Sequence, residues 1–202
     1  MEDALIILVR YPELGKVKTR IAKTAGDVKA LHIYQQLLQH TYEITSKVEV
    51  DCFVFYSDAI HYDDIWATEN YNKYVQHGDT LGKRMLHAFQ TVFEQGYKRV
   101  CIIGSDCFAL TTAIIYKAFN HLQTNDVVVG PARDGGYYLL GMQTLYPSLF
   151  DIKEWSNADV FHETMKMVHQ LNLRSEVLIT LSDIDTEEDW NNRNISAGFT
   201  LP

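Results

Sequence analysis

The stretch RVCIIGSDCFAL, residues 99–110, carries four consecutive apolar residues, then a Gly-Ser turn and a carboxylate, Asp106. A short apolar run bounded by turn residues is typical of a strand buried on both faces, as in a parallel sheet covered by helices. Ligands of such sheets bind outside the carboxyl ends of the strands. The position of Asp106 favours an oxygen ligand for Mg²⁺, although Asp106 could instead only cap a helix that begins near Thr111.

The composition predicts one globular domain over residues 1–202. The chain has 202 residues, 47% of them hydrophobic and 22% charged, and its apolar runs are shorter than the roughly 20 residues that a membrane span requires. The apolar run Leu5–Val9 is too short for a signal peptide, so we expect a cytoplasmic protein. A net charge of −8 argues against nonspecific binding of nucleic acid. The three cysteines have no metal-type spacing and are expected to be buried apolar residues: Cys52, Cys101 and Cys107.

Strand-like and helix-like patterns alternate along the chain, which predicts an α/β three-layer fold with a mostly parallel sheet. The expected strands are Ala4–Val9, Val50–Tyr56, Arg99–Ile103, Asp126–Gly130, Tyr137–Leu140 and Glu176–Leu181. The expected helices are Val28–Ser46, Leu81–Gln95, Thr111–Leu122 and Ala158–Leu171. Asp79 is the expected cap of the second helix and Ser156-Asn157 of the fourth, and Asp58–Asn72 is expected to be irregular.

A basic segment, GKVKTR, follows the first expected strand. Gly15 lets the backbone bend, and the side chains of Lys16, Lys18 and Arg20 could surround a triphosphate. The spacing is not that of a Walker loop. A solvated basic turn explains the same residues equally well.

A glycine turn leads into the second expected helix within QHGDTLGKR, residues 76–84. Two glycines at a helix start allow backbone N–H groups to approach an anionic or electron-rich ligand, so Gly78 and Arg84 are candidate binding residues. An ordinary capped helix is the alternative.

The segment GPARDGGYYLLG, residues 130–141, places a charged loop between two expected strands. Consecutive glycines at a strand edge favour close approach of a ligand. Asp134 and Arg133 could orient an acceptor, and Tyr137 or Tyr138 could stack on a ring. Asp-Gly is also a strong hairpin signal, and a hairpin is compatible with a site.

The last acidic cluster, LSDIDTEED, residues 181–189, also follows an expected strand. In an extended segment the spacing of Asp183 and Asp185 puts both side chains on one side, where they could share one Mg²⁺ with Asp106. The following acids are better explained by the first turn of a helix capped by Asp185 or Thr186. The scattered histidines indicate neither a catalytic triad nor a zinc site.

The motifs taken together resemble those of small bacterial transferases with the GT-A, or nucleotide-diphospho-sugar transferase, fold, a family also called radical-SAM/selenodomain-associated transferases. The resemblance rests on VKTRI (17–21), GDTLGKR (78–84), IGSDC (103–107), GPARDGGY (130–137), WS (155–156) and DIDT (183–186). It implies a three-layer α/β/α sandwich of GT-A type. It also implies a distant similarity to nucleotidyltransferases such as phospholactate guanylyltransferase.

The resemblance also implies roles for individual residues. Lys18 and Arg20 would bind phosphates, and Gly78 with its neighbours would bind the nucleotide. Further candidate binding residues in the same segments are Gly15, Lys16, Arg84 and Ser105, which precedes Asp106. Metal ligands would be Asp106 with Asp183 or Asp185, holding Mg²⁺ or Mn²⁺. The residues assigned to catalysis would be Asp134, near the acceptor, with Lys18 and Arg20.

Three positions depart from the pattern of these transferases: Phe108 and Leu14 stand where proline is common, and Asn157 where threonine usually follows WS. Proline would stiffen the loop behind Asp106, and Phe108 adds bulk instead. We therefore keep two hypotheses. The first is a Mg²⁺-dependent transferase that uses a nucleoside triphosphate or nucleotide-sugar and a small acceptor, and reacts at phosphorus or at an anomeric carbon. The second is a non-catalytic nucleotide-binding or regulatory protein. The sequence leaves the oligomeric state open.

Overall fold

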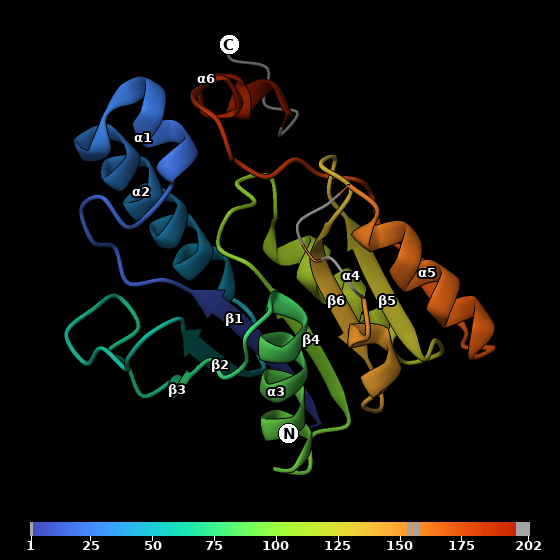
Figure 1. Cartoon of the computed structure of the whole chain (residues 1–202). Helices are drawn as coiled ribbons and strands as arrows, with labels where there is room; N and C mark the ends of the chain where they lie inside the picture. Colours follow the sequence, from blue (N-terminus) through green and yellow to red (C-terminus); the bar gives the residue numbers. More distant parts are fainter. Residues whose placement is uncertain (1, 153–154, 156–157, 197–202) are drawn as a thin grey trace.

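The computed structural model describes residues 2–152, 155 and 158–196 (Figure 1). The expected cap Ser156-Asn157 lies outside this part of the chain. The strands are β1 (Asp3–Val9), β2 (Asp51–Tyr56), β3 (Tyr71–Val75), β4 (Arg99–Ile103), β5 (Val127–Pro131), β6 (Tyr137–Met142) and β7 (Ser175–Val177). The helices are α1 (Thr19–Ala25), α2 (Asp27–Thr45), α3 (Leu81–Phe93), α4 (Thr112–His121), the 3₁₀ turn η1 (Pro147–Phe150), α5 (Val160–Gln170) and α6 (Glu187–Ser196).

The strands form one seven-stranded sheet in the order β3-β2-β1-β4-β6-β5-β7. Strand β6 pairs antiparallel with both of its neighbours, β4 and β5, and the other pairs are parallel. The three-layer, mostly parallel α/β fold predicted from the sequence is therefore confirmed. The carboxyl ends of β1, β2, β3 and β4 lie at one edge of the sheet, because these four strands are mutually parallel.

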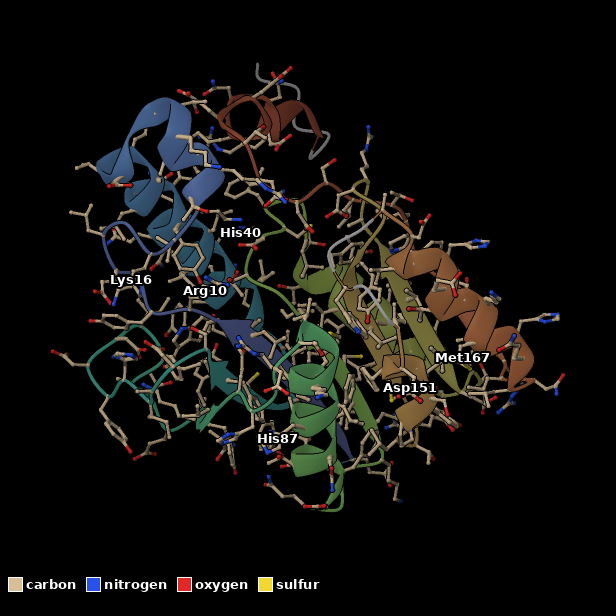
Figure 2. The ribbon with its side chains drawn as sticks, viewed as in Figure 1. Arg10, Lys16, His40, His87, Asp151 and Met167 are labelled. Atoms are coloured by element: carbon tan, nitrogen blue, oxygen red, sulfur yellow. The ribbon has the colours of Figure 1, made fainter. Side chains whose placement is uncertain are left out.

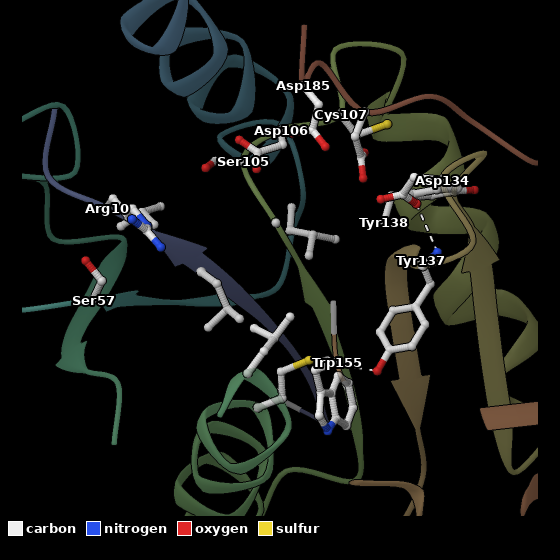
Figure 3. Close-up of a pocket in the computed structure, with 18 of the residues that line it drawn as sticks. Arg10, Ser57, Ser105, Asp106, Cys107, Asp134, Tyr137, Tyr138, Trp155 and Asp185 are labelled. Carbon is white, nitrogen blue, oxygen red and sulfur yellow. Dashed lines mark hydrogen bonds between the residues drawn. The ribbon is translucent and has the colours of Figure 1, made fainter. Parts of the chain in front are cut away.

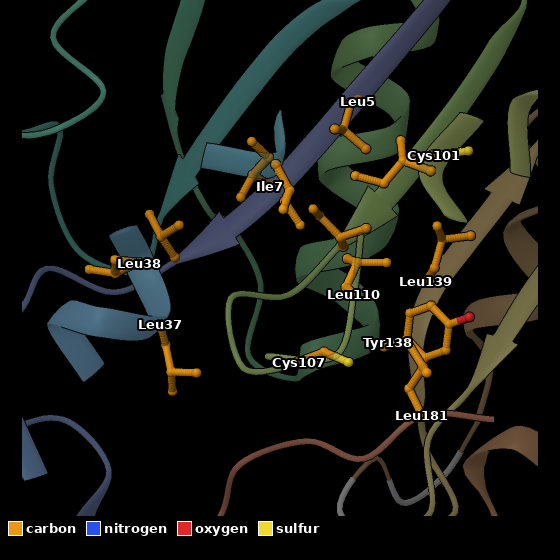
Figure 4. Close-up of a cluster of buried hydrophobic side chains, with 14 of the residues drawn as sticks. Leu5, Ile7, Leu37, Leu38, Cys101, Cys107, Leu110, Tyr138, Leu139 and Leu181 are labelled. Carbon is orange, nitrogen blue, oxygen red and sulfur yellow. The ribbon is translucent and has the colours of Figure 1, made fainter. Parts of the chain in front are cut away.

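Alternation of side chains along the strands builds two apolar layers. Leu5 and Ile7 of β1 join one buried cluster, which packs under α2 and α4 (Figure 4). Ala4 and Ile6 point the other way and join a second cluster, which packs against α3, η1 and α5. Each strand of the centre is buried on both faces, as expected for a sheet covered by helices. The three cysteines are free and buried, as predicted.

Four local expectations were wrong. Residues Tyr71–Val75 form the edge strand β3. This strand was not predicted because the polar residues Asn72 and Lys73 interrupt its apolar sequence. Residues Thr19–Ala25 form the short helix α1. Its buried residue is Ile21, and one buried position is too few to show the periodicity of a helix in the sequence. Thr80, not Asp79, caps α3, and the Thr80 side chain accepts a hydrogen bond from the Lys83 N–H.

The fourth is the expected strand Glu176–Leu181, which is much shorter in the structure. Strand β7 ends at Val177, and only an isolated bridge between Ala132 and Leu181 continues the pairing. The register of β5 shifts at Gly130 and Pro131, and a proline has no N–H to donate. Among the described residues, the helices include none that is both long and apolar enough to cross a membrane.

Candidate functional site

A cleft of about 770 Å³ opens at the carboxyl edge of the sheet and extends between α3 and the β5–β6 hairpin (Figure 3). Eight of the side chains predicted from the sequence line it: Lys18, Arg20, Arg84, Ser105, Asp106, Asp134, Asp183 and Asp185. They come from five separate segments of the chain. The fold therefore brings most of the predicted site residues together at one place.

Asp106 lies directly beyond β4, in the turn that leads to α4. Helix α4 is capped by Thr111, whose side chain accepts a hydrogen bond from the Ile114 N–H at 3.3 Å. The cap role considered for Asp106 is therefore wrong. The Asp106 backbone carbonyl accepts from the Ile184 N–H at 2.9 Å, which fixes the segment carrying Asp183 and Asp185 beside the β4 turn.

Lys18 extends from the start of α1 into this group of carboxylates. Its Nζ lies 2.8 Å from Asp106 Oδ1 and 3.6 Å from Asp185 Oδ1, and it donates to the Ile184 carbonyl at 2.7 Å. The Lys18 side chain is only 7% exposed, whereas Arg20, which pairs with Asp185 at 2.9 Å, is 71% exposed. One buried ammonium therefore joins the N-terminal basic segment to two of the predicted metal ligands.

The Asp183 side chain is partly buried. Burial, with the negative charges of Asp106 and Asp134, raises the pKa of Asp183 from 3.8 to about 7, and Lys18 opposes the shift. The carboxylates of the cleft thus lie close enough for their negative charges to repel one another.

Asp134 lies at the tip of the β5–β6 hairpin, so the hairpin expected from Asp-Gly is present. Asp134 Oδ1 accepts from the Gly136 N–H at 2.9 Å, which holds the exposed carboxylate at the cleft. The Arg133 N–H donates to the Leu181 carbonyl at 2.9 Å, so the hairpin tip and the Asp183 segment run side by side.

Four predicted residues do not line the cleft: Gly15, Lys16, Gly78 and Arg133. Lys16 points away in the loop after β1 and pairs with Glu13 at 2.9 Å, with 69% of its side chain exposed (Figure 2). Gly78, at a φ of +132°, contributes its carbonyl, which accepts from Arg84 Nε at 3.0 Å. Gly78 therefore positions a cleft residue, while Lys16 is a solvated surface cation.

Three polar residues of the cleft were missed: Arg10, Ser57 and Gln76. Each directly follows one of the strands β1, β2 and β3. The strand-end argument applied to Asp106 would have found Arg10 and Ser57, whose strands were predicted, but not Gln76, because β3 was missed. Gln76 Nε2 donates to the Phe55 carbonyl at 2.8 Å, which fixes its amide beside Ser57.

An aromatic wall, made of Tyr137 and Trp155, forms the end of the cleft opposite the carboxylates (Figure 3). Their rings meet edge to face with centroids 6.5 Å apart, and the Tyr137 hydroxyl donates to Met85 Sδ at 3.8 Å. The indole lies so close to Gly82 of α3 that a Cβ there would overlap it. The second glycine of GDTLGKR is therefore needed for the tryptophan of a different motif.

Phe108 packs outside the cleft, between the β4 turn and α6. Its ring contacts those of His40 and Trp190, with centroids 4.6 and 5.8 Å away, and the Arg193 guanidinium stacks 3.8 Å from the Trp190 ring centroid. The Phe108 side chain, at a position where the related transferases commonly have proline, thus anchors α6 onto the segment that carries Asp106.

Known proteins resemble this chain in sequence family and in fold. The family described as an uncharacterized protein conserved in bacteria, DUF2064, matches residues 39–157. The chain belongs to this family. A search of curated proteins gave no match.

This DUF2064 protein is also similar to proteins of known structure. A protein of Desulfovibrio desulfuricans G20 with the provisional name nucleotide-diphospho-sugar transferase is 32% identical, with 98% of this chain and 92% of that chain covered and a TM-score of 0.85. The 4-diphosphocytidyl-2C-methyl-D-erythritol synthase of Anaerococcus prevotii DSM 20548 is 12% identical (98% and 95% covered, TM-score 0.60). Rv0371c of Mycobacterium tuberculosis H37Rv, solved in complex with manganese, is 13% identical (95% and 97% covered, TM-score 0.57). The two distant likenesses concern the fold.

Proposed function

We propose that this protein is a nucleotide-using transferase of GT-A type, which binds a nucleoside triphosphate or nucleotide-sugar with Mg²⁺ or Mn²⁺ and transfers a group to a small acceptor. The observation that carries the proposal is the convergence of Lys18 and Arg20 with Asp106 and Asp185 in one cleft. The provisional name of the Desulfovibrio relative and the synthase of similar fold support the reaction class.

The carboxylates suit a divalent cation. Asp106, Asp183 and Asp185 supply the hard oxygen donors that Mg²⁺ and Mn²⁺ prefer, and the resident cation, Lys18 Nζ, lies among them. In the described part of the chain, no three His, Cys, Asp or Glu side chains form a group that could hold a metal ion as they stand. A bound metal would complete its shell with water and phosphate oxygens and would neutralise charge on the leaving group.

The basic side chains of the cleft would bind the phosphates. Arg10, Lys18, Arg20 and Arg84 match the four aspartates of the cleft in number, in a protein whose net charge is −8. The cleft is therefore more positive than the rest of the molecule, which allows a polyanion to enter. Guanidinium groups at Arg10 and Arg20 can bind phosphate oxygens with two parallel hydrogen bonds each.

Asp134 would act on the acceptor. Its Oδ1 is held by Gly136, so Oδ2 is the oxygen that would accept a proton from, or orient, an acceptor hydroxyl. The exposed hairpin tip places this carboxylate at the cleft, between the other carboxylates and the aromatic wall.

The proposal is tested by Asp106→Asn, compared with Asp79→Asn, an equal change at a carboxylate that is 89% exposed and pairs with Lys83. In calorimetric titrations of CTP, GTP, ATP, UTP and UDP-glucose with Mg²⁺, we expect Asp106→Asn to weaken binding of the preferred nucleotide at least about tenfold, or 1.4 kcal/mol. Asp79→Asn should bind as the wild type does. Equal affinities of all three proteins would refute the metal assignment.

Product analysis separates the two reactions. Pyrophosphate released from a triphosphate in the presence of a phosphorylated acceptor indicates nucleotidyl transfer, and free nucleoside diphosphate from a sugar nucleotide indicates glycosyl transfer. Tight nucleotide binding with neither product over a broad acceptor panel would support the non-catalytic alternative.

A further inference from the structure

Lys18 holds an ammonium group where the proposed function requires a divalent cation. Its Nζ makes three contacts, with Asp106 Oδ1 at 2.8 Å, the Ile184 carbonyl at 2.7 Å and Asp185 Oδ1 at 3.6 Å. An ion that took Asp106 and Asp185 as ligands, at the 2.0–2.1 Å typical of Mg²⁺, would lie within a few ångströms of this charge. Two cations so close repel strongly in a partly desolvated site.

The side chain of Lys18 is suited to moving. Lysine carries a compact charge on a flexible four-carbon stem, unlike the planar fork of arginine. The backbone of Lys18 has a φ of 45° and a ψ of 48°, a left-handed conformation that favours glycine or asparagine, and its side chain makes no cap hydrogen bond to α1. The backbone conformation therefore gives no reason for a lysine at residue 18. In the metal-free protein, the reason is the set of contacts that its ammonium group makes.

A polyphosphate would offer Lys18 another partner. Arg20 and Arg10 also line the cleft, so phosphates bound there would lie within reach of the same loop. Movement of the ammonium from carboxylates to phosphates would free Asp106 and Asp185 for the metal.

We propose, resting on the function above, that Lys18 is an exchangeable internal cation. In the protein without ligands, its ammonium occupies the aspartate group, formed by Asp106 and Asp185, and excludes the metal. It leaves this group when a phosphate chain binds in the cleft. Metal and nucleotide then bind with positive coupling, and each raises the affinity of the other by the same factor. Lys18 acts as the residue that connects the two binding events.

The first test is the binding of Mn²⁺ alone, measured by electron paramagnetic resonance, to the wild type and to Lys18→Met. Methionine keeps most of the stem and removes the charge, so we expect Mn²⁺ to bind the variant at least about tenfold more tightly, a change equal to 1.4 kcal/mol. Lys16→Met, the same substitution at an exposed lysine outside the cleft, should leave the Mn²⁺ affinity unchanged.

The second test uses the wild-type protein and depends on no variant folding. Reductive methylation followed by peptide mass spectrometry reports the reactivity of each lysine amine. Lys18 should react slowly without metal, because its side chain is 7% exposed, and several times faster at saturating Mn²⁺, while Lys16 reacts equally in both states.

The outcomes separate this inference from the proposed function. If Mn²⁺ binds the wild type and Lys18→Met equally, is lost in Asp106→Asn, and leaves Lys18 labelling unchanged, the metal site stands and the exchange is refuted. If Mn²⁺ alone binds neither the wild type nor Lys18→Met, the exchange is refuted, and the titration of Asp106→Asn with nucleotide and Mg²⁺ described above decides the metal site separately.

Discussion

At the scale of single residues, Asp183 carries a carboxyl group whose ionisation its surroundings oppose. Burial first, and then the charges of Asp106 and Asp134, raise its pKa to about 7. In the unfolded chain this group titrates near 3.8, so between about pH 4 and 7 the folded protein binds more protons than the unfolded one. The free energy of unfolding therefore falls as the pH rises through this range. Residues arranged for a ligand commonly reduce stability in this way.

Asp183→Asn should stabilise the metal-free protein at pH 8. Removing the opposed charge is expected to raise the free energy of unfolding by about 1 to 2 kcal/mol, a value reduced for the partial exposure of the site. The gain should disappear near pH 4, where Asp183 is already protonated. Urea unfolding in EDTA at both pH values measures it, with Asp79→Asn as the control. If Asp183→Asn raised the free energy of unfolding equally at both pH values, the unfavourable ionisation of Asp183 could not be the cause.

At the scale of elements, motifs far apart in the sequence depend on one another. Helix α3 presents Gly82 to the Trp155 indole, and the Trp155 ring stacks on Phe150 with centroids 6.3 Å apart. The helix start, the η1 turn and the wall of the cleft thus form one packing unit. None of this was predictable from the sequence, because the spacing of a motif does not reveal which side chain fills the space left by a glycine.

Gly82→Ala tests this unit. A methyl group at residue 82 overlaps the indole, so we expect Trp155 to leave its place and the tryptophan fluorescence to change, since Trp66 and Trp190 are buried elsewhere. Alanine favours a helix by about 1 kcal/mol over glycine, which offsets part of the lost packing. Gly104→Ala, where a Cβ meets open space, should leave the emission unchanged. Identical emission from all three proteins would exclude the contact.

The packing of α6 gives Phe108 a structural role. Phe108→Ala removes the ring contacts with His40 and Trp190, and we expect the free energy of unfolding to fall by about 2 kcal/mol, below the range for a fully buried phenylalanine because the ring is partly exposed. Tyr62→Ala, at a side chain that is 79% exposed, is the control. Chemical denaturation measures both, and an unchanged stability of Phe108→Ala would refute the anchoring role.

At the scale of the whole molecule, the sheet explains what the sequence could and could not predict. The buried strands β1, β2 and β4 are apolar throughout most of their length, so their runs predicted the fold class, and the residues after them included Asp106. The edge strand β3 is interrupted by two consecutive polar residues, Asn72 and Lys73, and the short α1 has little apolar surface, so both were missed. The contacts of Lys18 with Ile184 and Asp185 depend on the path of the chain after β7, which no local pattern contains.

Ligand binding should act on the whole molecule through the coupling at Lys18. At 100 times the dissociation constant, a ligand stabilises the folded state by about 2.7 kcal/mol, which for a chain of this size corresponds to a shift of about 5 to 10 °C in Tm. We expect the preferred nucleotide and Mn²⁺ together to raise Tm by more than the sum of the separate shifts. Thermal-shift measurements with each alone and with both decide this, and simple additivity would contradict the coupling.

The contact between Lys18 and the Ile184 carbonyl joins residues 166 positions apart. Closing so large a loop is slow, and a chain made from its N-terminus can begin to form β1, β2 and β4 before Ile184 exists. The aspartate group is therefore assembled last during synthesis. A nascent chain would carry the basic segment and Asp106 without their partners, and it would acquire the complete cleft only after Asp185 had left the ribosome.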